Sequence, residues 1–326
     1  MCAADITAQK AILTRLLEEE LDEQEQISCL RQLALDHLDR TIIEHAVVLL
    51  RARMIAVSAN DPALIDLCGT GGDKSGSFNI STTASLVVAG AGYRVAKHGN
   101  VSITSKSGSI DMLRALGVRL PDTPGTALTQ LDQAGIMFLF APYYHPAFKK
   151  FSDARKHLAA EGTRTIFNLL GPLLNPAGVK RAVIGVFDPR FVGPVAEVLH
   201  HTGTEKALVF HGDGMDELSL TGNNIVCEIN AGKLTSHEWV PENFGLPRCT
   251  AADLAGGTAA ENAATAKAIL QGDLADARKN MVLLNAGAAI YAASNVPDMT
   301  LEKAIALARQ SLESGQALKV LERLNA

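Results

Sequence analysis

A glycine-rich segment near residue 70 has the residue types of an anion-binding loop. Residues 69–73 read Gly-Thr-Gly-Gly-Asp, and Asn-Ile-Ser-Thr follows at residues 79–82. Glycine lets a backbone approach a ligand closely, and helix-opening N–H groups with nearby hydroxyls bind anions. The spacing fits neither the dinucleotide motif GxGxxG nor the P-loop GxxxxGK(S/T), so neither a dinucleotide nor ATP is the first choice. Taken alone, the segment also fits an ordinary strand-to-helix turn.

A second polar loop begins at Lys97. The Lys-His-Gly-Asn sequence of residues 97–100 follows an expected strand at residues 93–96, and residues 102–109 add five serine or threonine hydroxyls and another lysine. Two such loops at the carboxyl ends of neighbouring parallel strands would enclose one polyphosphate. Either loop alone is also typical of a solvated turn.

Two adjacent carboxylates, Asp216 and Glu217, follow an expected strand at residues 207–210. Magnesium prefers hard oxygen ligands and usually keeps waters and substrate phosphates in its shell. Most adjacent acidic pairs are solvated residues at a helix start. Opposite two phosphate-binding loops, however, this pair indicates a magnesium site.

The elements that must position these residues alternate between short apolar runs and helices. Strands are expected at residues 64–68, 93–96, 136–140, 182–186 and 207–210, with a hairpin at residues 225–229 and 234–240. Parallel strands need long crossovers, so this alternation predicts an α/β fold with a mostly parallel central sheet. Helices are expected at the C-terminal end, at residues 261–270, 275–293 and 301–324.

The first sixty residues show helical patterns only. One helix is expected to start near Asp22, and another behind a capping box formed by Thr41 and Glu44. We therefore expect a small N-terminal helical domain over residues 1–61 and an α/β domain over residues 62–326.

Composition excludes several classes of protein. The 326 residues are 47% hydrophobic and 20% charged, which is unlike a disordered chain. Thirty Lys and Arg against 35 Asp and Glu give a net charge of −5, so no basic excess points to nucleic acid or to an anionic membrane. Five scattered cysteines without a CxxC pair, no signal peptide and no apolar run of about 20 residues predict a cytoplasmic protein.

Together, these motifs resemble those of the anthranilate phosphoribosyltransferases. The resemblance covers roughly residues 63–324 in the same order, and its motifs lie at residues 69–73, 79–82, 97–100, 105–109, 138–142, 145–146, 164–168, 171–176, 214–219, 259–263 and 283–286. It implies a fold like that of the pyrimidine nucleoside phosphorylases and a homodimer formed through the helical domain. It also implies Mg²⁺-dependent transfer of the phosphoribosyl group of 5-phosphoribosyl 1-pyrophosphate to the amine of anthranilate, the second step of tryptophan biosynthesis from chorismate.

The resemblance also implies roles for individual residues. Catalysis would involve Lys97, Asp216 and Glu217, and Mg²⁺ would be held by Ser81, Asp216 and Glu217. The residues implied for the phosphoribosyl donor are Gly69, Gly72, Asp73, Ser77, Asn79, Ser81, Thr82, Lys97, Gly99, Asn100, Ser105 and Ser109. Those implied for anthranilate are Gly69, His98, Asn100, His145, Arg155 and Pro172.

Two departures from the family pattern bear on the acceptor. Val101 stands where the family usually has arginine, and the segment from Arg155 to Arg164 is longer than usual. A different aromatic acceptor is therefore an alternative, as are a nucleoside phosphorylase and a noncatalytic paralogue that binds nucleic acid. The phosphorylase has no need of the Asp216–Glu217 pair. The paralogue would be expected to lack the glycine-rich, Lys-His-Gly-Asn and acidic motifs and to carry positive charge.

Overall fold

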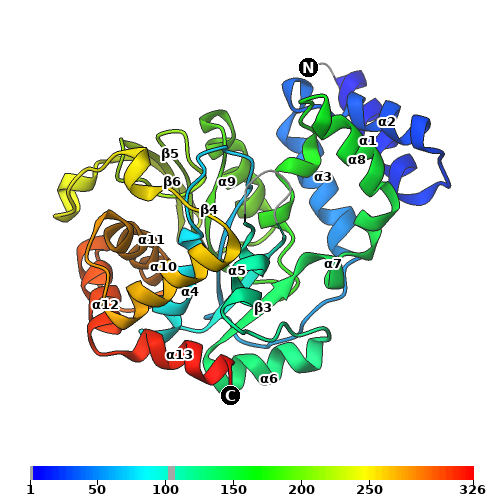
Figure 1. Cartoon of the computed structure of the whole chain (residues 1–326). Helices are drawn as coiled ribbons and strands as arrows, with labels where there is room; N and C mark the ends of the chain where they lie inside the picture. The colour runs from blue at the N-terminus through cyan, green and yellow to red at the C-terminus, as the bar shows by residue number, and fades with distance from the viewer. Residues whose placement is uncertain (1–2, 102–106) are drawn as a thin grey trace.

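A seven-stranded sheet forms the centre of the computed structural model, which describes residues 3–101 and 107–326 (Figure 1). The strand order is β3-β2-β1-β4-β5-β6-β7, in which β1 to β5 are parallel and β6 and β7 form an antiparallel hairpin. The strands are β1 (Ile65–Gly69), β2 (Val95–Gly99), β3 (Ile136–Phe140), β4 (Arg181–Gly185), β5 (Lys206–Gly212), β6 (Asn224–Asn230) and β7 (Lys233–Trp239). The expected α/β class and mostly parallel sheet are confirmed.

The five parallel strands are buried on both faces, which explains why they read as continuous apolar runs. On one face, Ile65, Leu67 and Val183 pack with α4 (Ile80–Gly90) and α11 (Ala277–Ala293). On the other face, Ile184 and Val209 pack with α9 (Val192–His201) and with the N-terminal helices. Successive side chains of a strand point to opposite faces, so β4, β5 and β6 each contribute to both cores.

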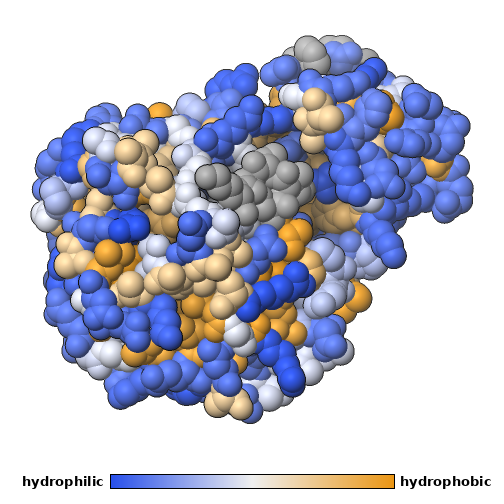
Figure 2. Space-filling model, viewed as in Figure 1, coloured by the Kyte–Doolittle hydropathy of each residue, from blue (hydrophilic) through white to orange (hydrophobic). Residues whose placement is uncertain are grey.

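A helical lobe projects from one side of the α/β body (Figures 1 and 2). It contains α1 (Ala3–Glu18), α2 (Glu23–Gln32) and α3 (Arg40–Arg51), and α8 (Ser152–Ala160) packs beside them from the middle of the chain. Leu13, Leu30 and Leu158 are buried in one shared core. The boundary at residue 61 remains a prediction, and the lobe also includes a segment from beyond it.

The remaining helices surround the body (Figure 1). They are α5 (Ser109–Ala115), α6 (Pro124–Ala134), α7 (Ala141–Tyr144), α10 (Ala259–Gln271), α12 (Leu301–Glu313) and α13 (Gln316–Leu324). Among the described residues, no helix has both the length and the apolar character needed to cross a membrane. The single helix expected at residues 301–324 is wrong, because Gly315 adopts a left-handed conformation (φ 72°) that separates α12 from α13.

The expected capping box of α3 is also wrong. Asp39 is the N-cap, and its Oδ1 accepts hydrogen bonds from the Thr41 N–H at 2.9 Å and the Thr41 hydroxyl at 2.8 Å. Glu44 instead lies 3.3 Å from the His201 ring of α9. By contrast, Asp22 does begin α2, in a capping box with Glu25.

We predict that Gly90→Ala destabilises the fold. A Cβ at Gly90 would lie 2.5 Å from the Ala317 amide nitrogen and 2.7 Å from its Cα, so α13 has to move away from α4. Overpacking of this kind costs about 1–3 kcal/mol of unfolding free energy, measurable in urea. Gly193→Ala in α9 is the control, because its Cβ meets no atom within 4 Å and the change removes only backbone freedom. Equal stability of the two variants would contradict close packing of α4 against α13.

Candidate active site

The acidic pair lies against strand ends that have no Cβ atoms. The last residues of β1, β4 and β5 are Gly69, Gly185 and Gly212. A Cβ at Gly69 would overlap the Asp216 carboxylate, and one at Gly185 would overlap the Asp216 carbonyl oxygen. One at Gly212 would lie 2.7 Å from the Ser219 amide nitrogen. None of these three glycines has a positive φ, so close approach is what requires glycine here.

Asp216 holds the glycine-rich loop that follows β1. The Gly71 N–H donates to Asp216 Oδ2 at 2.6 Å, and the Asp216 N–H donates to Asp73 Oδ2 at 3.3 Å. Gly71 and Gly72 have φ of 70° and 77°, a left-handed conformation that glycine adopts without strain. The loop and the acidic segment, far apart in sequence, are therefore directly bonded.

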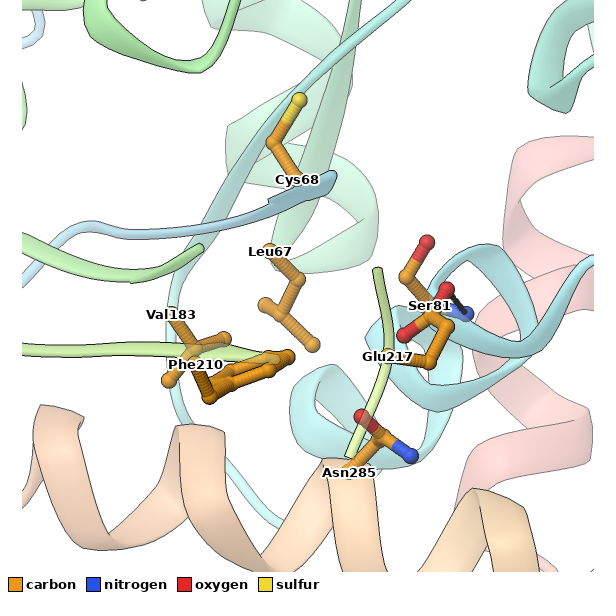
Figure 3. Close-up of a pocket in the computed structure, with 7 residues that line it drawn as sticks. All are labelled: Leu67, Cys68, Ser81, Val183, Phe210, Glu217 and Asn285. Atoms are coloured by element: carbon orange, nitrogen blue, oxygen red, sulfur yellow. Dashed lines mark hydrogen bonds between the residues drawn. The ribbon is translucent and has the colours of Figure 1, made fainter. Parts of the chain in front are cut away.

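Glu217 lies at the first turn of α4. The Ser81 N–H donates to Glu217 Oε1 at 3.1 Å, and Figure 3 shows the two residues side by side above Asn285. A carboxylate is favoured at a helix N-terminus, where the backbone N–H groups carry partial positive charge. The buried Lys97 ammonium donates to the Leu67 carbonyl and, at 3.2 Å, to Ser81 Oγ, so a cation lies next to the same turn.

Burial makes both carboxylates hard to ionise. It raises the pKa of Asp216 well above its usual range, with the charges of Asp73 and Glu217 adding to the effect. Burial also raises the pKa of Glu217 to about 7, although Lys97 and the Ser81 N–H oppose the shift. A cation bound between these oxygens would relieve both effects. Within the described residues, no cluster of three or more His, Cys, Asp or Glu side chains forms a complete metal cage.

The side chains of Lys97 and His98 lie on opposite faces of β2. Both were expected in a loop after the strand, and that expectation is wrong: in the parallel register Lys97 is opposite Phe138 and His98 is opposite Leu139 of β3. Because neighbouring side chains in a strand point to opposite faces, Lys97 reaches Ser81 of α4, whereas His98 reaches the Gly171 carbonyl at 3.0 Å.

The His98 side of the strand is lined by neutral aromatic groups. The ring of His145 lies 5.1 Å from that of His98, and Pro172 is buried in the turn that accepts the His98 hydrogen bond. Burial lowers the pKa of His98 to about 3 and that of His145 to about 4, so both rings are neutral near pH 7. The Nε2 atoms of both rings are buried and have no hydrogen-bond partner within the described residues.

Arg155 extends this aromatic side. Its guanidinium lies over the rings of Phe148 and Phe167, each at 5.6 Å, and Phe148 in turn contacts the His145 ring at 5.7 Å. Within the part of the chain that the structure describes, Arg155 forms neither a hydrogen bond nor an ion pair. A half-buried cation of this kind is available to a planar anion.

The other expected donor-binding residues lie mainly at the starts of α4 and α5 and at the end of β2. Asn79 is the N-cap of α4, where its amide donates to the Ser107 carbonyl at 3.2 Å. Thr82 is buried in the first turn of α4, and Ser77 pairs with Ala255 in an isolated bridge. Ser109 begins α5, and its hydroxyl donates to the Asn100 carbonyl at 3.1 Å; a Cβ at Gly99 would lie 2.6 Å from that hydroxyl. Ser105 lies outside the described residues.

Several residues of the site were not expected from the sequence. Gly185 has no motif of its own, and only its contact with Asp216 shows its importance. Arg164 donates to the Gly72 carbonyl and stacks on the Phe187 ring at 4.0 Å. Asn262 donates to Asn79 Oδ1 at 2.9 Å. Arg164 and Asn262 do lie in motifs that carry the family resemblance, and that signal could have identified them.

A buried acid, Asp66 of β1, links β2 to the segment that follows Gly171 and Pro172. Its Oδ1 accepts from the His98 N–H at 3.1 Å, and its Oδ2 accepts from the Asn175 amide at 2.7 Å. Asn175 also donates to the Ala96 carbonyl at 2.8 Å. This network fixes the turn that contains Gly171 and Pro172 onto the ends of β1 and β2.

We predict that Asp66 makes stability depend on pH between about 4 and 6. Burial raises its pKa from 3.8 to about 6, so across this window the folded protein keeps a proton that the unfolded chain has released. Below about pH 4, ionisation of Asp66 therefore costs the folded protein nothing. As the pH rises through 6, it lowers the free energy of unfolding by about 3 kcal/mol. Urea unfolding at several pH values should show a decline over this window, and Asp66→Asn should make it smaller, while Asp216 and Glu217, whose pKa values are also raised, account for the remainder. The exposed Asp153→Asn is the control, and an unchanged pH dependence in Asp66→Asn would contradict the prediction.

Comparisons with known proteins agree with this geometry. Residues 61–318 match the sequence profile of the glycosyl transferase family, a/b domain. The anthranilate phosphoribosyltransferase of Rhodopseudomonas palustris (strain TIE-1) is 48% identical over 86% of this chain and 82% of its own length. That of Moorella thermoacetica (strain ATCC 39073 / JCM 9320) is 46% identical over 84% of this chain and 80% of its own length.

Solved structures show the same relationship over almost the whole chain. The crystal structure of anthranilate phosphoribosyltransferase from Thermus thermophilus has a TM-score of 0.89 at 39% identity and covers 98% of this chain and 94% of its own. The enzyme from Saccharomyces cerevisiae in complex with PRPP and Mg has a TM-score of 0.84 at 26% identity and covers 98% of this chain and 91% of its own. This chain therefore belongs to the anthranilate phosphoribosyltransferase family.

Proposed function

We propose that this chain transfers the phosphoribosyl group of 5-phosphoribosyl 1-pyrophosphate to the amine of anthranilate, and that Mg²⁺ is its cofactor. The observation that carries the proposal is the buried Asp216–Glu217 pair, bonded to the Gly71 and Ser81 amides and lying close to Lys97. Structures of the Saccharomyces cerevisiae relative in complex with PRPP and Mg, and with 4-fluoroanthranilate, support the donor, the metal and the acceptor.

The residues present fit a magnesium ion. Ser81, Asp216 and Glu217 would hold it, because they offer oxygen ligands only and both carboxyls have raised pKa values that a divalent cation would lower. When bound, Mg²⁺ would neutralise negative charge on the pyrophosphate. An incomplete protein shell is usual for Mg²⁺, which takes its other ligands from water and substrate phosphates.

Lys97 supplies fixed positive charge on the donor side. An ammonium has three donors, and the described contacts of Lys97 use two of them, on Leu67 and Ser81. The third donor is available to the leaving pyrophosphate as negative charge develops on it. Because the group is already buried and held by two hydrogen bonds, it needs no reorganisation during the reaction.

The acceptor side suits a neutral aromatic amine that carries a carboxylate. In our proposal, Arg155 orients the carboxylate as a two-donor fork, while Phe148 and Pro172 contact the ring. His98 faces a carbonyl through Nδ1, so that nitrogen carries the proton and Nε2 is left as an acceptor for an amine N–H. With pKa values near 3 and 4, neither histidine is a strong base, and a neutral amine requires none.

We further propose that the chain forms a homodimer through its helical lobe. Val48 of α3 and Ile55 just beyond it have relative exposures of 58% and 45%, so the lobe offers apolar side chains that a second copy of the chain could cover. Light scattering of the purified protein tests this proposal, and a monomeric mass would refute it.

The proposed reaction predicts a loss of anthranilate fluorescence that requires Mg²⁺. Purified protein, 5-phosphoribosyl 1-pyrophosphate and Mg²⁺ should consume anthranilate, and a chelator should stop the decay. Asp216→Asn should reduce turnover to background, because it removes a charged oxygen ligand while keeping the shape of the side chain.

Other outcomes of this experiment separate the alternatives. No decay, with calorimetric binding of the donor retained, would assign a different acceptor to the same donor site. Release of bases from pyrimidine nucleosides with inorganic phosphate would instead identify a phosphorylase.

We predict that Arg155→Ala raises the KM for anthranilate tenfold or more and leaves the KM for the donor nearly unchanged. The guanidinium forms no hydrogen bond or ion pair among the described residues, so its loss should affect acceptor binding first. Lys156→Ala is the matched control, since that lysine is 73% exposed and pairs with Asp153. An equal rise in both KM values would show that Arg155 does not bind the carboxylate.

A further inference from the structure

Two buried asparagines hold the chain immediately after the acidic pair. Asn285 of α11 accepts from the Leu218 N–H at 3.0 Å and donates to the Leu218 carbonyl at 2.8 Å. Asn224 of β6 accepts from the Ser219 N–H at 2.6 Å and donates to the Ser219 carbonyl at 3.0 Å. Each amide side chain thus pairs with both backbone groups of one residue, and the two residues are consecutive.

These pairings replace a strand partner that the segment lacks. Leu218 and Ser219 are fully buried but lie between β5 and β6, outside the hydrogen bonding of the sheet. Buried backbone groups have to be paired, and an asparagine side chain offers both a donor and an acceptor. Asn285 is itself 3% exposed in an otherwise apolar part of α11, where its amide also donates to the Met281 carbonyl at 3.0 Å.

The clamp at Leu218 acts directly on Glu217. Leu218 is the next residue, so fixing its N–H fixes the peptide plane that it shares with the Glu217 carbonyl. Figure 3 shows Asn285 on α11, pointing toward Glu217 and toward Ser81 of α4. On the opposite side, a Cβ-free Gly212 approaches the backbone of the same segment.

We propose that Asn285 is a positioning residue that sets the affinity of the Asp216–Glu217 pair for its divalent cation by clamping Leu218. The proposal rests on the proposed function, because it assigns Mg²⁺ to that pair. Asn285 touches neither carboxylate oxygen in the described contacts and acts only through the backbone. Residues that orient metal ligands in this indirect way typically alter metal affinity by 10- to 100-fold.

The test compares Asn285→Leu with Asn224→Leu. Both changes replace a buried asparagine by leucine, which is of similar size but cannot form hydrogen bonds. The Asn285 variant releases Leu218, which is next to Glu217, whereas the Asn224 variant releases Ser219, which is one residue further away. The measured quantity is the dissociation constant of Mn²⁺, used as a Mg²⁺ probe, from the electron paramagnetic resonance of the free ion with pyrophosphate present. We expect a rise of about tenfold for Asn285→Leu and a clearly smaller rise for Asn224→Leu.

A second readout follows the clamp itself. Hydrogen exchange of the Leu218 amide should accelerate in Asn285→Leu and not in Asn224→Leu. Asn285→Ser, whose hydroxyl is too short to reach both backbone groups, serves if Asn285→Leu does not fold, and we expect the same direction of change.

The outcomes separate this inference from the proposed function. Loss of unfolding free energy in Asn285→Leu or Asn285→Ser with an unchanged Mn²⁺ dissociation constant would overturn the positioning role. An equal rise of the Mn²⁺ dissociation constant in the Asn285 and Asn224 variants would also overturn it, because such a result indicates a general loss of rigidity in the segment. Absence of Mn²⁺ binding by the unaltered protein would refute the metal assignment itself.

Discussion

The site depends on one contact, the approach of the Asp216–Glu217 segment to strand ends that have no side chains. The 2.6 Å hydrogen bond from the Gly71 N–H to Asp216 forms only because Gly69 and Gly185 leave room for the carboxylate and its backbone. The loop after β1, the first turn of α4 and the segment after β5 are thereby brought together. As a consequence, the two carboxyls are buried, and their ionised forms are disfavoured. The backbone N–H donors and the Lys97 ammonium offset part of this desolvation cost.

Alternation along a single strand keeps this charged region apart from the aromatic one. Lys97 and His98 are adjacent in β2, so their side chains must point to opposite faces. In the proposed reaction, one face would receive the anionic leaving group, and the other would receive the aromatic ring of the acceptor. Asp66 and Asn175 join the backbone of β2 to β1 and to the turn that precedes Asn175, so they hold the His98 side of the site against the strand that leads into the glycine-rich loop.

The sequence allows accurate prediction of the features that rest on local patterns. Residues 136–140 form β3 as expected, and the other strands lie within about three residues of their expected ranges, because a short apolar run between glycine turns is a local signal. The helix cap was not predictable in this way, since Thr41 and Glu44 satisfy the capping-box pattern while Asp39 provides the actual N-cap. The expected strand ends at residue 96, which leaves Lys97 in a loop, whereas lysine is rarely buried and only the carbonyl of Leu67 and the hydroxyl of Ser81 explain its burial within β2.

Long-range pairing limits what can be predicted of the site. Gly185, Arg164 and Asn285 act through residues that are distant in sequence. Gly185 lies in no motif, and the family motifs that contain Arg164 and Asn285 do not indicate which atoms these side chains contact. A glycine at a strand end and an asparagine in an apolar helix each have ordinary structural explanations. Only the fold shows that the atoms opposite them belong to the acidic segment or to the glycine-rich loop.

The distribution of charge has a consequence for the chemistry. Burial near His98 lowers histidine pKa values to about 3 and 4, so the environment that accepts an aromatic ring also removes the basicity a proton-abstracting group would need. The same burial raises carboxyl pKa values on the other face, where Lys97 favours the charged form of Glu217 and a bound divalent cation would favour that of both carboxyls. A fold arranged in this way favours departure of an anion over deprotonation of a nucleophile. It therefore suits a reaction whose acceptor is already a neutral amine and whose barrier lies in breaking the bond to pyrophosphate.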